Sequence, residues 1–137
     1  MSIIKYFLQM LHSLPNGVTS SSDRRRWHER SGRLAEFVAA SLLIFKGYRI
    51  LARRQRTPYG ELDLIAVRGK RVAFVEVKLR RHIREAEAAI GQRQAGRMAR
   101  AAEHWIWRHR RYRASQIGMD AIYLARNALP RHVCDIL

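Results

Sequence analysis

Three charged side chains in the middle of this 137-residue chain are spaced in a way that could bind a metal ion. Asp63 lies in one strand-like segment, and Glu76 and Lys78 lie two residues apart in the next. Residues two apart in a strand share a face, so Lys78 can offset part of the negative charge of Glu76. Hard divalent cations take oxygen ligands from carboxylates, carbonyls and water. We therefore predict a Mg²⁺ or Mn²⁺ site formed by Asp63, Glu76 and the backbone carbonyl of Val77.

Phosphodiester hydrolysis is the reaction that such a site would support. The metal would polarise the phosphate and lower the pKa of a bound water. Lys78 would orient or help to deprotonate that water and stabilise charge on the phosphoryl oxygens. Glu36, in a helix-like segment, is a fourth catalytic candidate that could support the metal through a water. The structural alternative is a solvated face at Glu76 and Lys78, or an ion pair between Asp63 and Lys78. One shared register inside apolar strands favours the functional site.

Two strands must position these residues: Glu61–Val67 and Arg71–Leu79, with Gly69 and Lys70 as the loop of a β-hairpin. This register pairs apolar residues on both faces, which is typical of strands buried on both sides. One face then pairs Val67 with Val72, Ile65 with Phe74, Asp63 with Glu76 and Glu61 with Lys78. The other pairs Ala66 with Ala73, Leu64 with Val75 and Leu62 with Val77. A slip of one residue would destroy this sorting.

Helices and further strands flank the hairpin. Apolar residues three and four apart predict a helix that opens at Ser31-Gly32 and ends at Gly47. A strand at Tyr48–Ala52 and a basic loop through Pro58-Tyr59-Gly60 follow it. Beyond the hairpin the sequence predicts a helix from Glu85 to about His109, and strands at Met119–Leu124 and His132–Leu137 with Pro130 between them. This order predicts an α/β fold with a mixed central sheet.

Basic residues outnumber acidic ones by 27 to 11, which gives a net charge of +16. An excess of this size indicates a protein that binds polyanions, DNA more than RNA. A genome rich in G and C would explain the use of Arg in place of Lys, but not the excess over acids. Because the guanidinium fork matches phosphate geometry, we expect phosphate contacts from Arg53, Arg54, Arg56, Arg80, Arg81 and Arg84.

Residues 1–23 are predicted to form an N-terminal extension, flexible in the main, and residues 24–137 a single domain. The apolar run from Ile3 to Leu11 is too short to span a bilayer and is a poor secretory signal. It is typical of a frayed amphipathic helix or of an over-long start assignment. Cys134 is the only cysteine, so an internal disulfide is excluded and a cytoplasmic location is expected. The assembly state stays open, with a homodimer among the alternatives.

The segments Gly60-Glu61-Leu62-Asp63-Leu64-Ile65 and Phe74-Val75-Glu76-Val77-Lys78-Leu79-Arg80 form a motif that resembles the YraN family of small bacterial proteins. That family is similar to the PD-(D/E)XK nucleases, so the resemblance implies a restriction-endonuclease-like three-layer core. It assigns Asp63, Glu76 and Lys78 to catalytic positions and Glu36 to the helix carboxylate. Two departures are visible. Arg93-Gln94 stands where the family has a Lys, and Gly118-Met119-Asp120 keeps the Asp of an Arg-Phe-Asp motif without its Arg.

Three functions are compatible with these features. The first is a metal-dependent nuclease acting on DNA, with branched or damaged structures as candidate substrates. The second is a nucleic-acid-binding protein that keeps the nuclease fold without turnover, for which the missing basic residues leave room. The third is an assembly or membrane-surface protein that uses its arginines on anionic lipid and residues 1–14 as an anchor. The complete set of Asp63, Glu76 and Lys78 favours the first.

Overall fold

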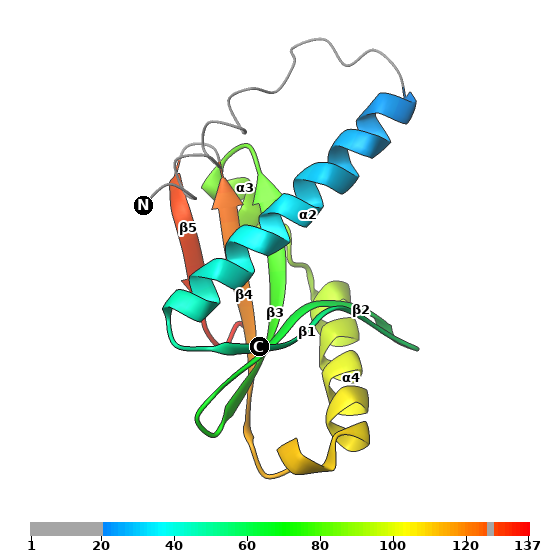
Figure 1. Ribbon diagram of the computed structural model, residues 1–137. Coiled ribbons are helices and arrows are strands. Elements are labelled where there is room, and N and C mark those ends of the chain that lie inside the picture. The colour runs from blue at the N-terminus through cyan, green and yellow to red at the C-terminus, as the bar shows by residue number, and fades with distance from the viewer. Residues whose placement is uncertain (1–20, 126–127) are drawn as a thin grey trace.

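The computed structural model describes residues 21–125 and 128–137, and the predicted extension up to residue 20 lies outside them. Along the chain follow helix α2 (Ser21–Phe45), strands β1 (Arg49–Thr57), β2 (Gly60–Arg68) and β3 (Arg71–Arg80), helices α3 (Ile83–Glu87) and α4 (Gln92–Arg108), the 3-10 helix η1 (Arg110–Tyr112), and strands β4 (Gln116–Ala125) and β5 (Ala128–Val133) (Figure 1). Within these residues, each helix is too short or too polar to cross a membrane.

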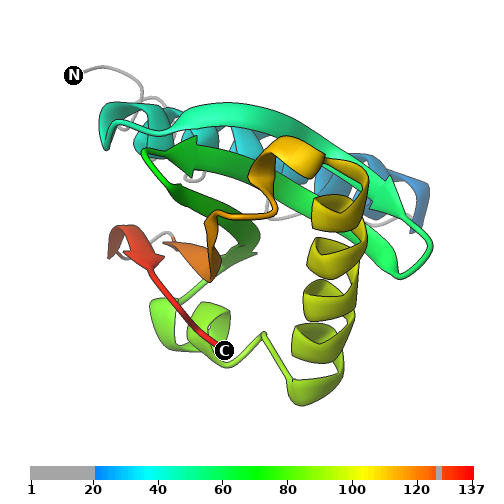
Figure 2. The ribbon, with the colours of Figure 1, turned by 90° about the horizontal axis from the view of Figure 1, so that it is seen from below.

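The five strands form one mixed sheet in the order β1-β2-β3-β4-β5. β1, β2 and β3 pair antiparallel as a meander, β3 and β4 pair in parallel, and β4 and β5 pair antiparallel. Helix α2 covers one face of the sheet, and α3 and α4 cover the other (Figure 2). The predicted α/β fold with a restriction-endonuclease-like three-layer core is confirmed.

Apolar side chains fill the space on both sides of the sheet. On the α2 face, Leu43 packs with Leu64 and Val75. On the α4 face, the ring of Trp105 meets the ring of Phe74 edge-on at a centroid distance of 5.7 Å. Each large apolar side chain buried in this way stabilises the fold by about 1.5–3 kcal/mol. Strands β2 and β3 are therefore held between two apolar layers, as their sequence predicts.

The ladder between β2 and β3 has the predicted register over the half nearest the turn. It runs from the pair Leu64–Val75 to the pair Arg68–Arg71. Gly69 in the turn has a φ of +58°, a left-handed conformation that favours glycine. The pairs predicted farther from the turn, up to Glu61 with Lys78, lie outside this ladder, so this part of the prediction is wrong.

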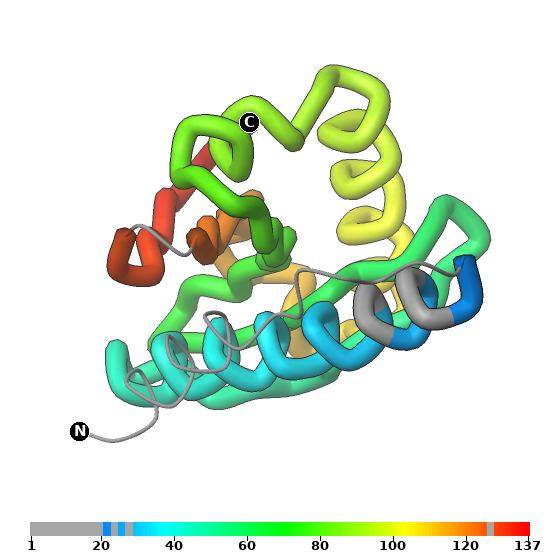
Figure 3. The backbone as a smooth tube through the Cα atoms, turned by 90° about the horizontal axis from the view of Figure 1, so that it is seen from above, coloured from blue at the N-terminus to red at the C-terminus, as the bar shows by residue number. Residues whose placement is uncertain are grey.

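Strands β2 and β3 diverge beyond Leu64 because each follows a different neighbour. β2 stays paired with β1 as far as Gly60, whereas β3 stays paired with β4 as far as Arg80. Leu62, predicted to share a face with Leu64, packs in the α4 cluster instead. The end of the β1–β2 hairpin consequently lies between α2 and α4 (Figure 3). The divergence opens the sheet at Asp63.

Strand β1 is longer than predicted and includes most of the segment predicted as a basic loop. It continues through Thr57, so the turn to β2 contains Pro58 and Tyr59. The arginines of this segment lie in the strand, where they are exposed. An edge strand can carry such charge because its open side faces water, and pairing with β2 supplies the structure that the local sequence does not indicate.

The helices also differ from their predicted bounds. Helix α2 begins at Ser21 rather than at Ser31, since the Arg-rich segment between them is a good helix former and contains no proline. The helix predicted from Glu85 to His109 is two helices. Gly91, with extended backbone, is the N-cap of α4, and Ile90, which falls inside the single predicted helix, packs with the cluster around Ala86.

The last strand lies earlier in the chain than predicted. β5 spans Ala128–Val133 rather than His132–Leu137. Pro130, predicted to separate two strands, lies inside β5. This is tolerated because β5 is at the edge of the sheet, where a missing backbone N–H can face away from the ladder.

Candidate active site

Carboxylates from three elements converge where β2 and β3 diverge. Glu36 comes from α2, Glu61 and Asp63 from β2, and Glu76 from β3. One oxygen each from Glu36, Glu61 and Asp63 lies within 4.8 Å of the other two. The sequence pointed to Glu36 and Asp63 but missed Glu61, which it placed opposite Lys78 in the ladder. The available signal was its spacing of two residues from Asp63.

The Asp63 carboxylate takes the place of a ladder partner for β3. Its Oδ2 accepts a hydrogen bond from the Val77 N–H at 2.8 Å. Burial, and then the negative charge of Glu76, raise the pKa of Asp63 to about 7 against the opposing effect of the Val77 hydrogen bond. A cation here would relieve this crowding of charge, so the residues fit a metal site. The part of the Val77 carbonyl as a metal ligand stays a prediction.

Glu76 is held by a lysine and by an amide. Lys78 Nζ lies 2.9 Å from Glu76 Oε1, and the two side chains are only 15% and 12% exposed. Gln94 on α4 donates a hydrogen bond to the same oxygen. The ion pair of Lys78 is therefore with Glu76, not with Glu61 or Asp63. Gln94 is a second residue that the sequence did not identify as part of the site, because only the position of α4 brings it there.

Arg54 bridges two of the carboxylates. Its Nε lies 3.5 Å from Glu36 Oε1 and 3.4 Å from Glu61 Oε1. Burial raises the pKa of Glu36, and Arg54 opposes that shift. The backbone of Arg54 has a φ of +49°, which is uncommon outside glycine and tends to occur at functional sites. Arg54, which the sequence predicts to contact phosphate, contacts these two carboxylates in the structure, and its phosphate contact stays a prediction.

A cavity of about 140 Å³ lies beside these groups. One wall is the end of the β1–β2 hairpin, the other is the first half of α4, and Glu76 lines it between them. Its lining consists of Tyr59, Gly60, Glu61, Glu76, Gln94, Arg97, Met98 and Ala101. Because a water occupies about 30 Å³ in the liquid, the cavity has room for several waters or for a small anion with part of its hydration.

The other arginines predicted to bind nucleic acid are exposed. Arg53 and Arg56 lie on β1, Arg80 at the end of β3, Arg81 directly after it, and Arg84 on α3. The side chain of Arg56 is 92% exposed, and its Nε lies 4.0 Å from Glu61 Oε2, so it is held weakly. Exposed guanidinium groups of this kind attract a phosphate backbone through counterion release.

The sequence matches the family model of the uncharacterised protein family UPF0102 over residues 35–124. The chain belongs to this family. The resemblance to YraN proteins, which form UPF0102, is confirmed. A UPF0102 protein of Bradyrhizobium sp. (strain ORS 278) is 45% identical over 119 residues, which cover 87% of this chain and 84% of that protein. A UPF0102 protein of Nitrobacter winogradskyi is 47% identical over 103 residues, which cover 75% of this chain and 87% of that protein. A UPF0102 protein of Rhodopseudomonas palustris (strain BisB18) is 47% identical over 104 residues, which cover 76% of this chain and 77% of that protein.

A second charged cluster in this UPF0102 protein surrounds Asp120, which is fully buried on β4. Arg71, at the start of β3, donates two hydrogen bonds to it, from Nη1 to Oδ2 at 2.9 Å and from Nη2 to Oδ1 at 2.6 Å. His132 Nε2 lies 2.9 Å from Oδ2, and the Asp135 N–H donates to Oδ1 at 3.0 Å. These contacts connect Asp120 on β4 to β3 through Arg71, to β5 through His132, and to the residues after β5 through Asp135.

Gly118 provides the space for the Arg71 guanidinium. A Cβ at this position would lie 2.0 Å from Arg71 Nη2. Arg71, on the neighbouring strand, thus places a guanidinium beside Asp120 in a chain whose Gly118-Met119-Asp120 lacks the Arg of the Arg-Phe-Asp motif. Asp120, His132 and Cys134 are close enough together to hold a metal, but the guanidinium already occupies both oxygens of Asp120. We assign this cluster to structure.

Without divalent metal, we expect the free energy of unfolding to fall as the pH rises from about 4 to about 7. Asp63 releases its proton near 3.8 in an ordinary environment but near 7 in the folded chain. Between these values the folded state binds more protons, so raising the pH favours unfolding, and the stabilising contribution of Asp63 is lost above its folded pKa. Chemical denaturation across this range should show a flatter profile for Asp63→Asn.

Mn²⁺ should reverse the loss at about pH 8, since a metal binds the deprotonated carboxylates of the folded state. The same buffers with Asp63→Asn serve as the control. An identical pH profile in the wild type and in Asp63→Asn would contradict the assignment of the raised pKa to Asp63.

Proposed function

We propose that this UPF0102 protein is a metal-dependent nuclease that hydrolyses phosphodiester bonds in DNA, with branched or damaged DNA among its substrates. One observation carries the proposal: oxygens of Glu36, Glu61 and Asp63 lie within 4.8 Å of one another. This cluster of oxygens lies next to the ion pair of Glu76 with Lys78 and next to the cavity of about 140 Å³. An all-oxygen donor set of this kind suits Mg²⁺ or Mn²⁺.

The residues take different parts in this proposal. Asp63 and Glu76 bind the metal directly, together with the Val77 carbonyl, and Glu36 supports it through a water. A Mg²⁺ or Mn²⁺ ion held in this way supplies Lewis-acid polarisation of the phosphate and a water of lowered pKa. Lys78 stands 2.9 Å from Glu76 and orients the attacking water while stabilising charge on the phosphoryl oxygens.

Glu61 would be a further carboxylate ligand of the metal, next to Asp63 and Glu36. Its side chain is 37% exposed and pairs with Arg54, whereas the side chains of Asp63 and Glu76 are more buried. Glu61 would therefore hold the metal as the most hydrated of these three carboxylates. Arg54 keeps Glu36 and Glu61 together before a cation binds, since its Nε lies within 3.5 Å of both.

Purified full-length chain should cleave DNA in Mg²⁺ or Mn²⁺ and lose this activity in EDTA. Branched, single-stranded and duplex DNA of the same sequence should be compared under each condition. The double variant Asp63→Asn with Glu76→Gln removes two charged ligands at nearly unchanged volume. It should lose cleavage and also the rise in melting temperature that Mn²⁺ causes in the wild type.

Cleavage that persists in EDTA or in the double variant would come from a contaminating nuclease and would count against the proposal. A wild type that neither cleaves DNA nor gains thermal stability in millimolar Mn²⁺ would refute the metal site itself. Measuring the melting temperature and cleavage on the same samples separates a folding defect from a lost ligand.

A second candidate function is nucleic-acid binding without turnover. The exposed arginines and the net charge of +16 favour it independently of the carboxylates. It predicts tight, salt-dependent binding to DNA that is unaffected by EDTA and by the Asp63→Asn and Glu76→Gln substitutions, with no cleavage under any metal condition.

A further inference from the structure

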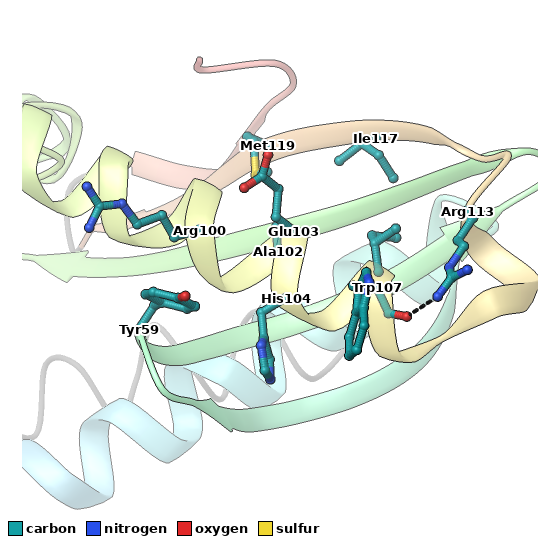
Figure 4. A pocket seen from close by; sticks show the side chains of 10 residues that line it. Tyr59, Arg100, Ala102, Glu103, His104, Trp107, Arg113, Ile117 and Met119 are labelled. Atoms are coloured by element: carbon teal, nitrogen blue, oxygen red, sulfur yellow. Dashed lines mark hydrogen bonds between the residues drawn. The ribbon is translucent and has the colours of Figure 1, made fainter.

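A row of rings leads away from the candidate active site along α4. Tyr59, in the turn between β1 and β2, lines the cavity that contains Glu76 and also a larger cavity of about 570 Å³. Its ring meets the ring of His104 edge-on at a centroid distance of 6.0 Å. Trp107 lies one helical turn farther along α4 and lines the same cavity (Figure 4). The cavity near the carboxylates is thus continued by an aromatic surface.

Two of these rings are open to solvent. Tyr59 is 44% exposed and Trp107 is 70% exposed, whereas Trp105, two residues earlier on the same helix, is 4% exposed in the core. Burying an aromatic ring stabilises a fold more than leaving it in water. The core does not need Trp107, so its position is explained better by a binding partner with flat, apolar faces.

The row is flanked by guanidinium groups. Arg97, which lines the cavity at Glu76, and Arg100, which lines the larger one, are exposed on α4. Arg113 lines the far end and donates a hydrogen bond from Nη2 to the Trp107 carbonyl at 2.7 Å. Glu103 is the acidic residue of this lining. Exposed rings between positive charges fit bases joined by phosphates, which stack on aromatic side chains in a basic groove.

We propose that this row binds a single-stranded segment of nucleic acid that continues from the phosphate at the candidate active site. Unpaired bases stack on Tyr59 and Trp107, and Arg97 and Arg100 contact the phosphates between them. The inference rests on the proposed function, because the row starts at that cavity. In a duplex the base faces cover one another, so a base must leave the stack to meet a ring. The substrate class is therefore a duplex with a single-stranded tail or branch.

Binding should be measured by fluorescence anisotropy on the Asp63→Asn, Glu76→Gln chain in EDTA, so that cleavage plays no part. The probes are one duplex with blunt ends and the same duplex with a single-stranded tail, each as DNA and as RNA. Tyr59→Ala and Trp107→Ala should each lower the affinity for the tailed probe about tenfold and leave the blunt probe within about twofold. Tyr59→Phe should keep the affinity, since the ring remains.

Phe45→Ala is the matched control, because Phe45 is 91% exposed at the far end of α2 and touches neither cavity. Equal losses on blunt and tailed probes, or no loss, would overturn the stacking row. So would Trp107→Ala changing the oligomeric state while sparing the affinity, which would make this face a protein interface. If the wild type never cleaves but Tyr59→Ala and Trp107→Ala selectively lose affinity for the tailed probe, the proposed nuclease activity is wrong and the stacking row is right. If Tyr59→Ala cleaves tailed DNA as well as the wild type does, the nuclease activity is right and the stacking row is wrong.

Discussion

Replacing Lys78 by alanine should lower the rate of DNA cleavage by a factor of about 10² to 10⁴ with little change in DNA affinity. Lys78 Nζ lies 2.9 Å from Glu76 Oε1 and is mostly buried. In the proposed reaction it acts on the attacking water and on charge that develops in the transition state, so its loss affects the rate more than ground-state binding. Single-turnover cleavage in Mn²⁺ and anisotropy in EDTA measure the two quantities.

Lys78→Arg should not restore the rate, because the guanidinium is bulkier and does not release a proton. Lys70→Ala, at an exposed position in the hairpin turn, is the control for the loss of one lysine charge. If Lys78→Ala cleaves normally but melts at a lower temperature, Lys78 serves only to neutralise Glu76, and the water-orienting role is wrong.

Replacing Arg71 by methionine should lower the free energy of unfolding by about 3–5 kcal/mol, the range found when one partner of a buried ion pair is removed. Asp120 is fully buried and would lose two hydrogen bonds. Burial alone would raise the pKa of Asp120, but the hydrogen bonds from His132 and Arg71 hold it well below its usual range. Denaturant unfolding measures the loss.

Arg81→Met removes an exposed arginine and should change stability by no more than about 0.5 kcal/mol. The double variant Arg71→Met with Asp120→Leu should recover part of the stability, because no charge is then buried alone. An Arg71→Met variant as stable as Arg81→Met would show that the cluster around Asp120 is dispensable.

The central hairpin could be predicted from the sequence because its pattern is local. Apolar residues on both faces and a glycine turn fix the register from Leu64–Val75 to the turn. The same reasoning fails beyond Leu64. There β2 follows its other neighbour β1, and β3 follows its other neighbour β4, and the hairpin's own sequence does not specify these neighbours. The Arg-rich half of β1 likewise takes its structure from pairing with β2 and gives no apolar signal of its own.

The candidate site was accessible from the sequence only in part, for a related reason. Asp63, Glu76 and Lys78 belong to one hairpin and directly follow its last ladder pair, Leu64–Val75, so their proximity could be predicted although Asp63 and Glu76 are not themselves paired. The contact of Glu61 with Arg54 depends on the pairing of β1 with β2, and the contact of Glu76 with Gln94 depends on the position of α4. Those are tertiary features, and the spacing of charged residues along the chain does not contain them.

The parallel pairing of β3 with β4 also has a consequence for synthesis of the chain. Strands β1, β2 and β3 can pair as soon as they leave the ribosome, because hairpin contacts are local and close quickly. The partner of β3 on its other side, from Gln116 to Ala125, emerges only after α3 and α4. Until then β3, whose residues from Val72 to Glu76 are buried in the finished sheet, presents an unpaired edge to other nascent chains. This interval, rather than the native state, is when the protein is most exposed to aggregation.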